Sequence, residues 1–535
     1  MAIDGVSGRT SYIGSGILNL RSQIEDMTAQ LANGRVATNY AGMGTGRGLA
    51  IGLRAQVANI ASYSDTMTNI NTRISVANLA LQRLNDIGSE VKGAAASAGS
   101  TLDNTGQTPG QKTASLDFFD SVDMLNSQTS DRYLFSGRTT DTAPVTAADQ
   151  IMDGNGAAIA GLKQVIRERL EADLGTTGMG RTIVSAGATP TSVQIGEDFA
   201  ADPYALPTPI GASPYGLKIS AISTTITGAT VTQPTETPPT IPPAAPNPVA
   251  MGIDLGAVVP TEGQTVSFTF DLPDGTQETI KLTASSQTPL PANSFAIDPG
   301  DPLAVPPVPA SPAITAANMQ AALTDAVQKL SGSALAAASA IKAGDDFFSN
   351  TPPLRVAGTA PFGNATASVA GTPADTVFWY HGEPDSASDP ARGTAVGRVD
   401  DAITVQYGIR ADEQALRKQL QTVAVFAAVT TSATDPNGSN KLAALNQRVA
   451  ANLATVPGQQ TIQNIQADLA GAQAAMKSTA DRQTQTKALA QTMLDSIEGI
   501  NNDEVATKIL ALQTSLQASY QLTSQLYQMS LVKFL

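Results

Sequence analysis

Hydrophobic residues near the amino end recur at alternating spacings of three and four residues. The run consists of Ile13, Ile17, Leu20, Ile24, Met27 and Leu31. This spacing is typical of a helix that packs along a coiled-coil seam. Asn33-Gly34 follows, a pair that commonly ends a helix. The pattern therefore predicts an amino-terminal helix that ends near Asn33 and offers one apolar seam to a partner helix.

A second seam follows a glycine-rich loop over residues 42–48. Its members are Ile60, Tyr63, Met67, Ile70, Ile74, Ala77, Leu81 and Leu84. A helix from Ile60 to Val91 would be roughly 48 Å long at 1.5 Å per residue. The loop lacks the Gly-Lys-Ser/Thr ending of a phosphate-binding P-loop, so we interpret it as a hinge.

The carboxyl end repeats the same spacing in two further runs. The first consists of Ile462, Ile465, Leu469, Ala472 and Met476, and the second of Val505, Ile509, Leu512 and Leu516. Beyond them, apolar residues spread around the helix: Tyr520, Leu522, Leu526, Tyr527, Leu531 and Phe534. A helix that is apolar on several faces is buried by its own protein or by an assembly. A stripe of glutamines interrupts the uncharged stretch from residue 509 to 532, so we predict no membrane span.

Proline separates these ends from the middle of the chain. None precedes Pro109 or follows Pro457, and 21 of the 32 lie between residues 201 and 320. Because proline breaks helix interiors, long helices are expected at the ends only. Residues 265–284 predict a β-hairpin, residues 217–232 a strand pair and residues 313–342 a helix. The predicted fold class is α+β: a long coiled-coil-like helical bundle formed by both chain ends, with an inserted β-rich central domain.

This organisation predicts five segments. They are an amino-terminal assembly helix (1–45), the amino-terminal half of a helical rod domain (46–185), an inserted Pro-rich and β-rich outer domain (186–400), the carboxyl-terminal half of the rod (401–500) and a carboxyl-terminal assembly helix (501–535). We assign the seams of residues 13–31, with Leu512, Leu516, Tyr520, Leu526, Tyr527, Leu531 and Phe534, to contacts between subunits. The seams of residues 60–84 and 462–476 are assigned to the rod core.

The amino-acid composition excludes most classes of chemical function. With 46 acidic against 32 basic residues the net charge is −14, which argues against nucleic-acid binding. There is no cysteine and one histidine, His381, so thiol chemistry and Cys/His metal sites are excluded. Asp345-Asp346 and Asp400-Asp401 are interpreted as helix caps or solvated pairs, since a metal site needs more oxygen ligands. We predict no enzyme activity, metal or cofactor.

Three segments carry a resemblance to a known family. The first is Asp131-Arg132-Tyr133-Leu134-Phe135-Ser136-Gly137-Arg138 with Thr142-Ala143-Pro144. The second runs from residues 398–401 through Tyr407-Gly408 to residues 426–429, and the third covers residues 516–520 and 529–535. Together they resemble the flagellin superfamily, and within it the branch of hook–filament junction proteins (hook-associated proteins of type 3). The resemblance covers about the first 185 and last 140 residues, and the Gly-rich loop over residues 39–48 departs from the turn that many relatives have.

The resemblance implies a structural adaptor that joins the flagellar hook, through the first hook-associated protein, to the flagellin filament. It implies export by the flagellar type III apparatus, an extracellular location and terminal helices that bundle between copies in a ring. The implied partners are further copies of the chain, the first hook-associated protein, flagellin and an export chaperone. A filament flagellin is the alternative, and a binding or hydrolase domain displayed on a flagellin-like scaffold is a more remote one.

Overall fold

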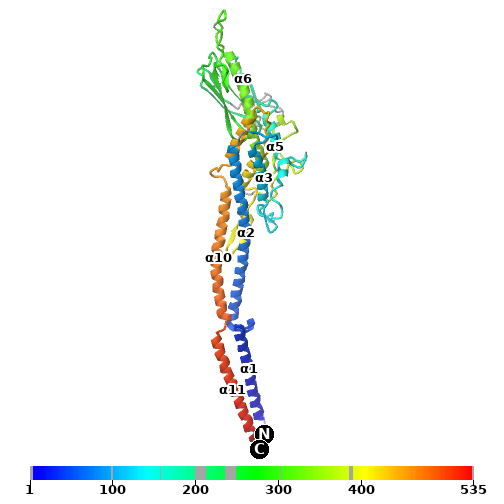
Figure 1. Ribbon diagram of the computed structural model, residues 1–535, viewed down its shortest axis with the longest axis vertical. Coiled ribbons are helices and arrows are strands. Elements are labelled where there is room, and N and C mark those ends of the chain that lie inside the picture. Colours follow the sequence, from blue (N-terminus) through cyan, green and yellow to red (C-terminus); the bar gives the residue numbers. More distant parts are fainter. Residues whose placement is uncertain are drawn as a thin grey trace, which may run out of the picture. The chain divides into compact units, whose positions relative to one another are not determined.

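The computed structural model describes residues 4–97, 101–156, 158–198, 213–234, 249–301, 303–384 and 389–532. Over these residues the protein is a mixed α+β chain, with helices at both ends and β-sheets in the middle (Figure 1). This part of the predicted fold class is confirmed.

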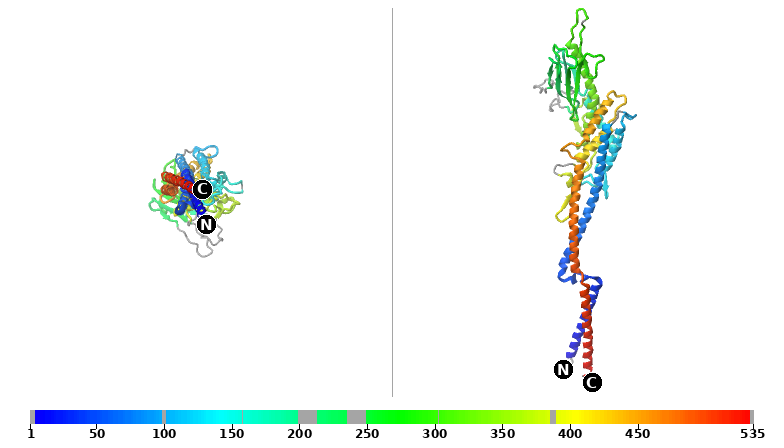
Figure 2. Two further views of the ribbon diagram at one scale, coloured as in Figure 1. Left: turned by 90° about the horizontal axis from the view of Figure 1, so that it is seen from below. Right: turned by 60° about the vertical axis from the view of Figure 1, so that its left-hand side comes forward.

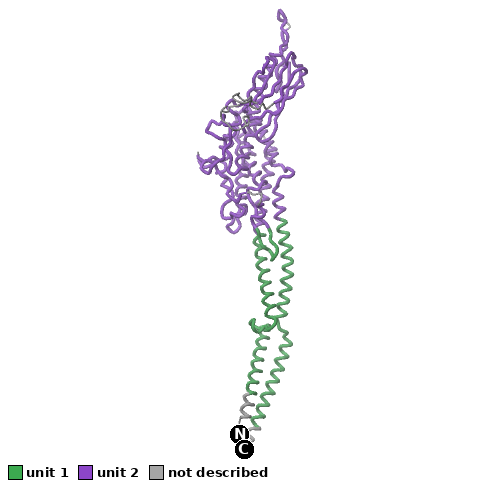
Figure 3. Tube along the Cα trace, turned by 180° about the vertical axis from the view of Figure 1, so that it is seen from behind, with its two compact units in different colours: residues 1–71, 396–405, 470–535 green, residues 72–395, 406–469 purple. Residues whose placement is uncertain are grey.

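The chain divides into two compact units (Figure 3). Unit 1 contains residues 1–71, 396–405 and 470–535, and unit 2 contains residues 72–395 and 406–469. Unit 1 thus joins both chain ends to a short segment from the middle of the sequence. Two long helices, α2 (Arg47–Ser97) and α10 (Ile462–Glu498), contribute residues to both units.

Unit 1 consists mainly of helices. α1 (Asp4–Asn33) and α11 (Asn502–Val532) pack against each other and lie side by side in Figures 1 and 2. The first helix ends where predicted, because Gly34 adopts a φ of +68°. In the α2 and α10 segments of this unit, the side chain of Gln473 donates to that of Asn71 at 3.2 Å. The remaining elements are a 3-10 helix, η1 (Tyr40–Gly46), and a two-stranded sheet, β13 (Val396–Arg398) and β14 (Thr404–Gln406).

The helical part of unit 2 gathers α3 (Pro109–Leu125), α4 (Ala148–Asp153), α5 (Leu162–Leu174), α7 (Ala336–Phe348), α8 (Gln414–Ala428) and α9 (Gly438–Asn452). α3 packs on α8, and α5 packs on α7. A capping box fixes the start of α3: the Gln111 backbone N–H donates to the Thr108 hydroxyl at 3.2 Å, and the Thr108 N–H donates to Gln111 Oε1 at 3.0 Å. The Gln111 amide also donates to the Val429 carbonyl at 2.7 Å, so one buried glutamine ties α3 to the end of α8.

Two four-stranded sheets form the β-rich part of unit 2. One has the order β10-β9-β8-β5, with strands Ser294–Ala296, Gln277–Ser285, Thr265–Asp271 and Lys218–Thr224. The other has the order β3-β4-β7-β6, with strands Thr182–Ala186, Ser192–Glu197, Ala250–Asp254 and Thr230–Thr232. α6 (Pro312–Leu330) contacts strands of both sheets, and Met319 and Leu323 on this helix are fully buried with Phe268 and Phe270 of β8.

The predicted hairpin is confirmed, because β8 and β9 pair antiparallel on either side of Gly275. The helix predicted over residues 313–342 is also confirmed, as α6, a π-helical turn (Ser331–Leu335) and α7. The strand pair predicted over residues 217–232 is wrong. β5 pairs with β8 and β6 pairs with β7, so the two strands belong to different sheets. Of the Pro-rich stretch over residues 234–248, all but Pro234 lies outside the described residues.

Short elements complete unit 2. β1 (Gln128–Thr129) and β2 (Arg132–Tyr133) form a small hairpin, and β11 (Leu354–Val356) pairs with β12 (Ser368–Ala370). Two 3-10 turns span Phe362–Asn364 and Ala391–Thr394. Ser130 and Asp131 make the turn of the first hairpin with φ values of 54° and 57°, in the left-handed region.

Candidate subunit interface

The predicted amino-terminal seam faces α11. Ile13, Ile17, Leu20, Ile24 and Met27 are each half-buried, whereas Leu31 at the end of the seam is exposed. A helix packed on one side only covers its seam incompletely. Packing against α11 within one chain therefore leaves part of every residue of this α1 seam accessible.

The seam of α11 that packs on α1 is apolar in its first half and polar in its second half. Val505 is buried, and Ile509, Leu512 and Leu516 are half-buried. The next two positions at the same spacing are Ser519 and Thr523, which are also half-buried. The apolar part of the contact thus stops at Leu516, although the helix continues for more than four further turns.

Large apolar side chains also point away from the seam. Tyr12 and Leu18 on α1 are 82% and 68% exposed. On α11 the exposed set is Leu510, Tyr520, Leu522, Leu526 and Tyr527. Its composition allowed α11 to be buried either by its own protein or by an assembly. Because these side chains are exposed, burial of α11 within the single chain is contradicted. The side chain of Leu531 and all of Phe534 lie outside the described residues.

An open groove of about 410 Å³ follows one side of the α1–α11 pair. Tyr12, Gly16 and Ile17 line it from α1, and Ser519 and Leu522 line it from α11. The absence of a side chain at Gly16 leaves this space open, since a Cβ there would meet no atom within 4 Å. The groove gives the pair an accessible apolar surface besides its seam.

Hydrogen bonds join the region where α1 leads into α2 to the region where α10 leads into α11, within unit 1. Glu498, 6% exposed, accepts a hydrogen bond from Arg54 Nη2 at 2.6 Å. Arg54 Nη1 also donates to the Tyr40 hydroxyl at 3.0 Å, and the guanidinium lies 5.4 Å from the centre of that ring. These hydrogen bonds raise the pKa of Arg54. The Val36 N–H donates to the Glu498 carbonyl at 2.8 Å, so backbone as well as side chains join the two connections.

The Gly-rich loop takes part in the same joint. Gly44 has a φ of +56°, and a Cβ on Gly46 would lie 2.9 Å from Ile497 Cγ2. Larger residues would strain the first position and push α10 away at the second. The sequence did not indicate Arg54, Tyr40 or Glu498 as functional residues. Arg54 and Glu498 are 444 positions apart, so no local pattern connects them.

The residues assigned to the rod core are mostly buried. Ile60, Met67, Ile70 and Met476 are buried in unit 1, and Ile74, Leu81, Leu84, Ile462, Ile465 and Leu469 are buried in unit 2. Tyr63 differs, because it is half-buried and its hydroxyl donates to Asp401 at 2.7 Å. This hydrogen bond raises the pKa of Tyr63. Tyr63 thus holds the β13–β14 turn on α2.

The acidic pairs have different surroundings. Asp401 is exposed, and Asp400 pairs with Arg482 on α10. The interpretation of Asp346 as a cap or solvated residue is wrong. Its side chain is only 9% exposed and lies 3.0 Å from Arg169 Nη1 of α5 and 2.5 Å from Lys342 Nζ. Burial raises the pKa of Asp346.

Arg169 is the centre of this buried charge cluster in unit 2. Its Nε lies 2.9 Å from Asp173, its Nη2 donates to the Pro214 carbonyl at 2.7 Å and it stacks 4.7 Å from the centre of the Tyr215 ring. Asp173 in turn accepts from the Gly216 N–H at 2.8 Å. The cluster joins α5, α7 and the segment before β5, and each charge has an opposite partner, as a structural site requires.

His381 is exposed, and its Nε2 lies 2.9 Å from the Thr146 hydroxyl. Among the described residues no carboxylate is hydrogen-bonded to its ring, so they assemble no nucleophile–base–acid arrangement around it. No group of three or more Asp, Glu or His side chains is placed to hold a metal ion within the described part of the chain. No described helix is long and apolar enough to cross a membrane.

The chain matches no family model, no curated protein and no solved structure. A function for it therefore has to be argued from its own residues and geometry.

Proposed function

We propose that the chain is a structural subunit of the bacterial flagellum, which joins the hook to the filament as an adaptor. In this proposal α1 and α11 of neighbouring copies bundle into a ring in a coiled-coil-like manner. The first hook-associated protein lies on one side of the ring and flagellin on the other. The chain reaches this extracellular position through the flagellar export apparatus, with an export chaperone covering it beforehand.

The observation that carries the proposal is the apolar surface of the α1–α11 pair. Its seam is half-buried, and Tyr12, Leu18, Leu522 and Tyr527 point outward. Fully burying an aliphatic or aromatic side chain contributes roughly 1.5–3 kcal/mol. Contacts of several such residues with a neighbouring copy would suffice to drive association, and a solitary helix pair of this kind gains stability from it.

The segments that resemble the flagellin superfamily support the proposal by their arrangement. Ser136 forms a β-bridge with Arg410, and the Gly137 N–H donates to the Ile409 carbonyl at 3.2 Å. The Ala411 N–H donates to the Phe135 carbonyl at 2.8 Å. The segment closing the amino-terminal helices thus pairs with the segment that leads into the carboxyl-terminal helices. This pairing is what a rod built from both halves of the chain requires.

Deleting the gene in the source bacterium tests the proposal. We expect intact hooks without filaments, with flagellin released into the medium because it has nothing to attach to. Expression of the full chain should restore filaments, whereas a chain that lacks residues 502–532 should not. Filaments of normal number in the deletion strain would contradict the adaptor role. Bare hooks with no flagellin in the medium would instead support the filament-flagellin alternative.

A further inference from the structure

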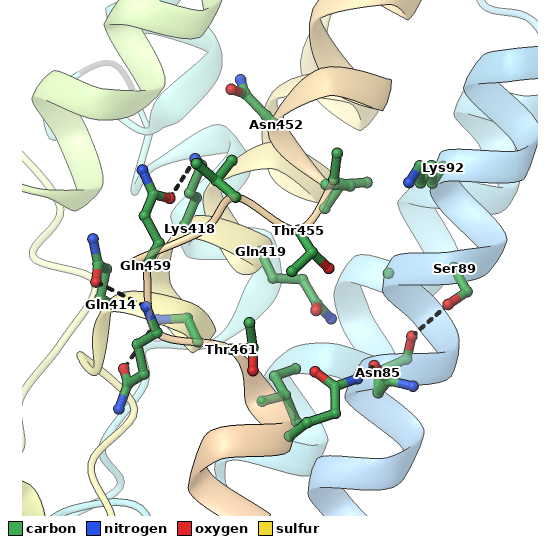
Figure 4. A pocket seen from close by; sticks show the side chains of 18 residues that line it. Asn85, Ser89, Lys92, Gln414, Lys418, Gln419, Asn452, Thr455, Gln459 and Thr461 are labelled. Carbon is green, nitrogen blue, oxygen red and sulfur yellow. Dashed lines mark hydrogen bonds between the residues drawn. The ribbon is translucent and has the colours of Figure 1, made fainter.

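A polar groove of about 310 Å³ lies in unit 2, apart from the terminal helices. α2 forms one wall, α8 forms the other, and the connection from α9 to α10 closes one side. Figure 4 shows Lys92 of α2 and Lys418 of α8 on opposite sides, with Gln419 and Thr455 between them. The volume is at the small end of the range for ligand sites, about 300–1,000 Å³.

The lining of this groove is unusual for so acidic a chain. Seven of the described residues that line it are carboxamides, three are hydroxyls, two are lysines and none is a carboxylate: Asn85, Gln414, Gln419, Asn452, Gln459, Gln460, Gln463, Ser89, Thr455, Thr461, Lys92 and Lys418. Gln460 in the lining donates to Glu413, which lies outside the lining and is paired with Arg392 at 2.5 Å. The groove is therefore a locally cationic site with many hydrogen-bonding groups.

Internal hydrogen bonds hold part of the lining in place. Gln460 accepts from the Ala415 N–H at 3.3 Å and donates to Glu413 at 2.9 Å, which ties the connection to the start of α8. Gln419 donates to the Leu84 carbonyl of α2. Gly88 permits this approach, because a Cβ there would lie 2.8 Å from Gln419 Oε1. The groove is thus prearranged, with one end of the Gln419 amide already engaged.

Other polar groups remain available to a ligand. Lys92 is exposed, and among the described residues neither its ammonium nor the Asn452 amide has a side-chain hydrogen bond. Lys418 donates to Gln459 Oε1 at 3.1 Å, which engages one of its three N–H groups. Amides offer both donors and acceptors, the combination that sugar hydroxyls satisfy, and the two ammonium groups favour an anion. No aromatic side chain lines the groove among the described residues, so flat aromatic ligands gain no stacking surface.

A second groove of about 490 Å³ lies beside the first. The two share Gln414, Lys418, Asn452 and Gln459. Asp274 and Asp345 line the second groove, but each is paired with a cation, Arg448 at 2.7 Å and Lys342 at 3.1 Å. A ligand longer than one sugar unit could therefore extend past Lys418 without meeting an unpaired carboxylate.

We infer that the two grooves bind an acidic oligosaccharide, with its carboxylates between Lys92 and Lys418 and its hydroxyls on the carboxamides. This binding does not depend on the assembly role proposed above, because the grooves lie on α2, α8 and the α9–α10 connection. It adds a recognition function to unit 2.

The test uses the full-length chain and saturation-transfer difference NMR titrations. The probe is a hyaluronan tetrasaccharide. The control is fully N-acetylated chitotetraose, an uncharged tetrasaccharide of the same length that has hydroxyl and acetamido groups but no carboxylate. We expect hyaluronan tetrasaccharide to bind at least about tenfold more tightly, the ratio that one charge-assisted contact supplies. Lys92→Gln combined with Lys418→Gln should lower its affinity to that of chitotetraose. Lys281→Gln, which removes an exposed lysine on β9, should leave binding unchanged.

Three results of the sugar titrations would overturn the inference. These are equal affinity for both sugars, full binding by the double lysine variant with an unaltered melting temperature, and no binding of either sugar at millimolar concentration. Tetraglutamate serves as a further probe. If it binds as tightly as the hyaluronan tetrasaccharide, the grooves recognise acidic peptide rather than saccharide, and the inference is likewise wrong.

Discussion

Leu522→Asp tests the role of the exposed surface of α11 in assembly without changing a residue of the α1–α11 seam. Leu522 is 58% exposed, so the folded chain loses little when it is replaced. In an assembly that covers this residue, more than half of its surface becomes buried. Taking that fraction of roughly 1.5–3 kcal/mol gives about 1–2 kcal/mol per contact, before the cost of burying the new carboxylate.

Such a loss changes an association constant by about tenfold or more, since each 1.4 kcal/mol is a factor of ten. The assay complements the deletion strain with each variant, counts filaments per cell and measures secreted chain by immunoblot. We expect Leu522→Asp to be secreted normally and to give few or no filaments. Purified Leu522→Asp should keep the helix content and melting temperature of the wild-type chain.

Gln521→Asp is the matched control, because it adds the same charge at the neighbouring exposed position without removing an apolar side chain. It should support near-normal filaments. Leu516→Asp provides the opposite comparison, because Leu516 is half-buried in the α1–α11 seam. It should lower helix content as well as assembly. If Leu522→Asp builds filaments as well as Gln521→Asp does, the outer surface of α11 has no role in assembly and our reasoning is refuted.

Further predictions concern unit 2. Arg169→Met leaves Asp173 buried without its cation and Asp346 with Lys342 as its remaining cation, and it should cost about 3–5 kcal/mol in urea unfolding; an unchanged midpoint would show that the cluster is not stabilised by charge pairing. Asp103→Asn should lower the melting temperature at pH 7. Bonds from Lys112, Thr105 and backbone N–H groups lower the pKa of Asp103, so its stabilisation is present above its unfolded value of 3.8 and is lost as the pH falls well below it. A difference that grows with acidity would contradict this. Gly106→Ala places a Cβ 2.5 Å from the Thr431 carbonyl oxygen, whereas Gly263→Ala shares the positive φ but meets no atom within 4 Å. Denaturant unfolding should show a larger loss of unfolding free energy for Gly106→Ala than for Gly263→Ala. Equal losses for the two variants would rule out the clash.

Periodicity predicted the long helices at the two chain ends because their seams depend on neighbours three and four residues apart. Local turn residues predicted the end of α1 at Asn33-Gly34 and the β8–β9 hairpin around Pro273-Asp274-Gly275. The prediction that β5 and β6 pair with each other was wrong because strand pairing is not a local property. Sheet partners are chosen by long-range contacts, and β5 found its partner more than 40 positions away.

Polar contacts between distant segments could not be predicted in the same way. Asp346 gave no sequence sign of burial, because Arg169 is 177 positions away. One sign was present on α10, where the seam after Met476 continues with Thr479 and Gln483, both buried. A glutamine at a seam position requires a buried partner, and Gln483 donates to the Val399 carbonyl at 2.7 Å. Polar residues at seam positions would have indicated that a third segment covers this helix.

Immunogold electron microscopy of sheared flagella from the source bacterium tests the central claim most directly. The antibody should be raised against unit 2, because its sheets and helices carry the chain's own folded core. The adaptor role predicts gold particles confined to the boundary between hook and filament. Particles along the whole filament, or none on the flagellum at all, would contradict it.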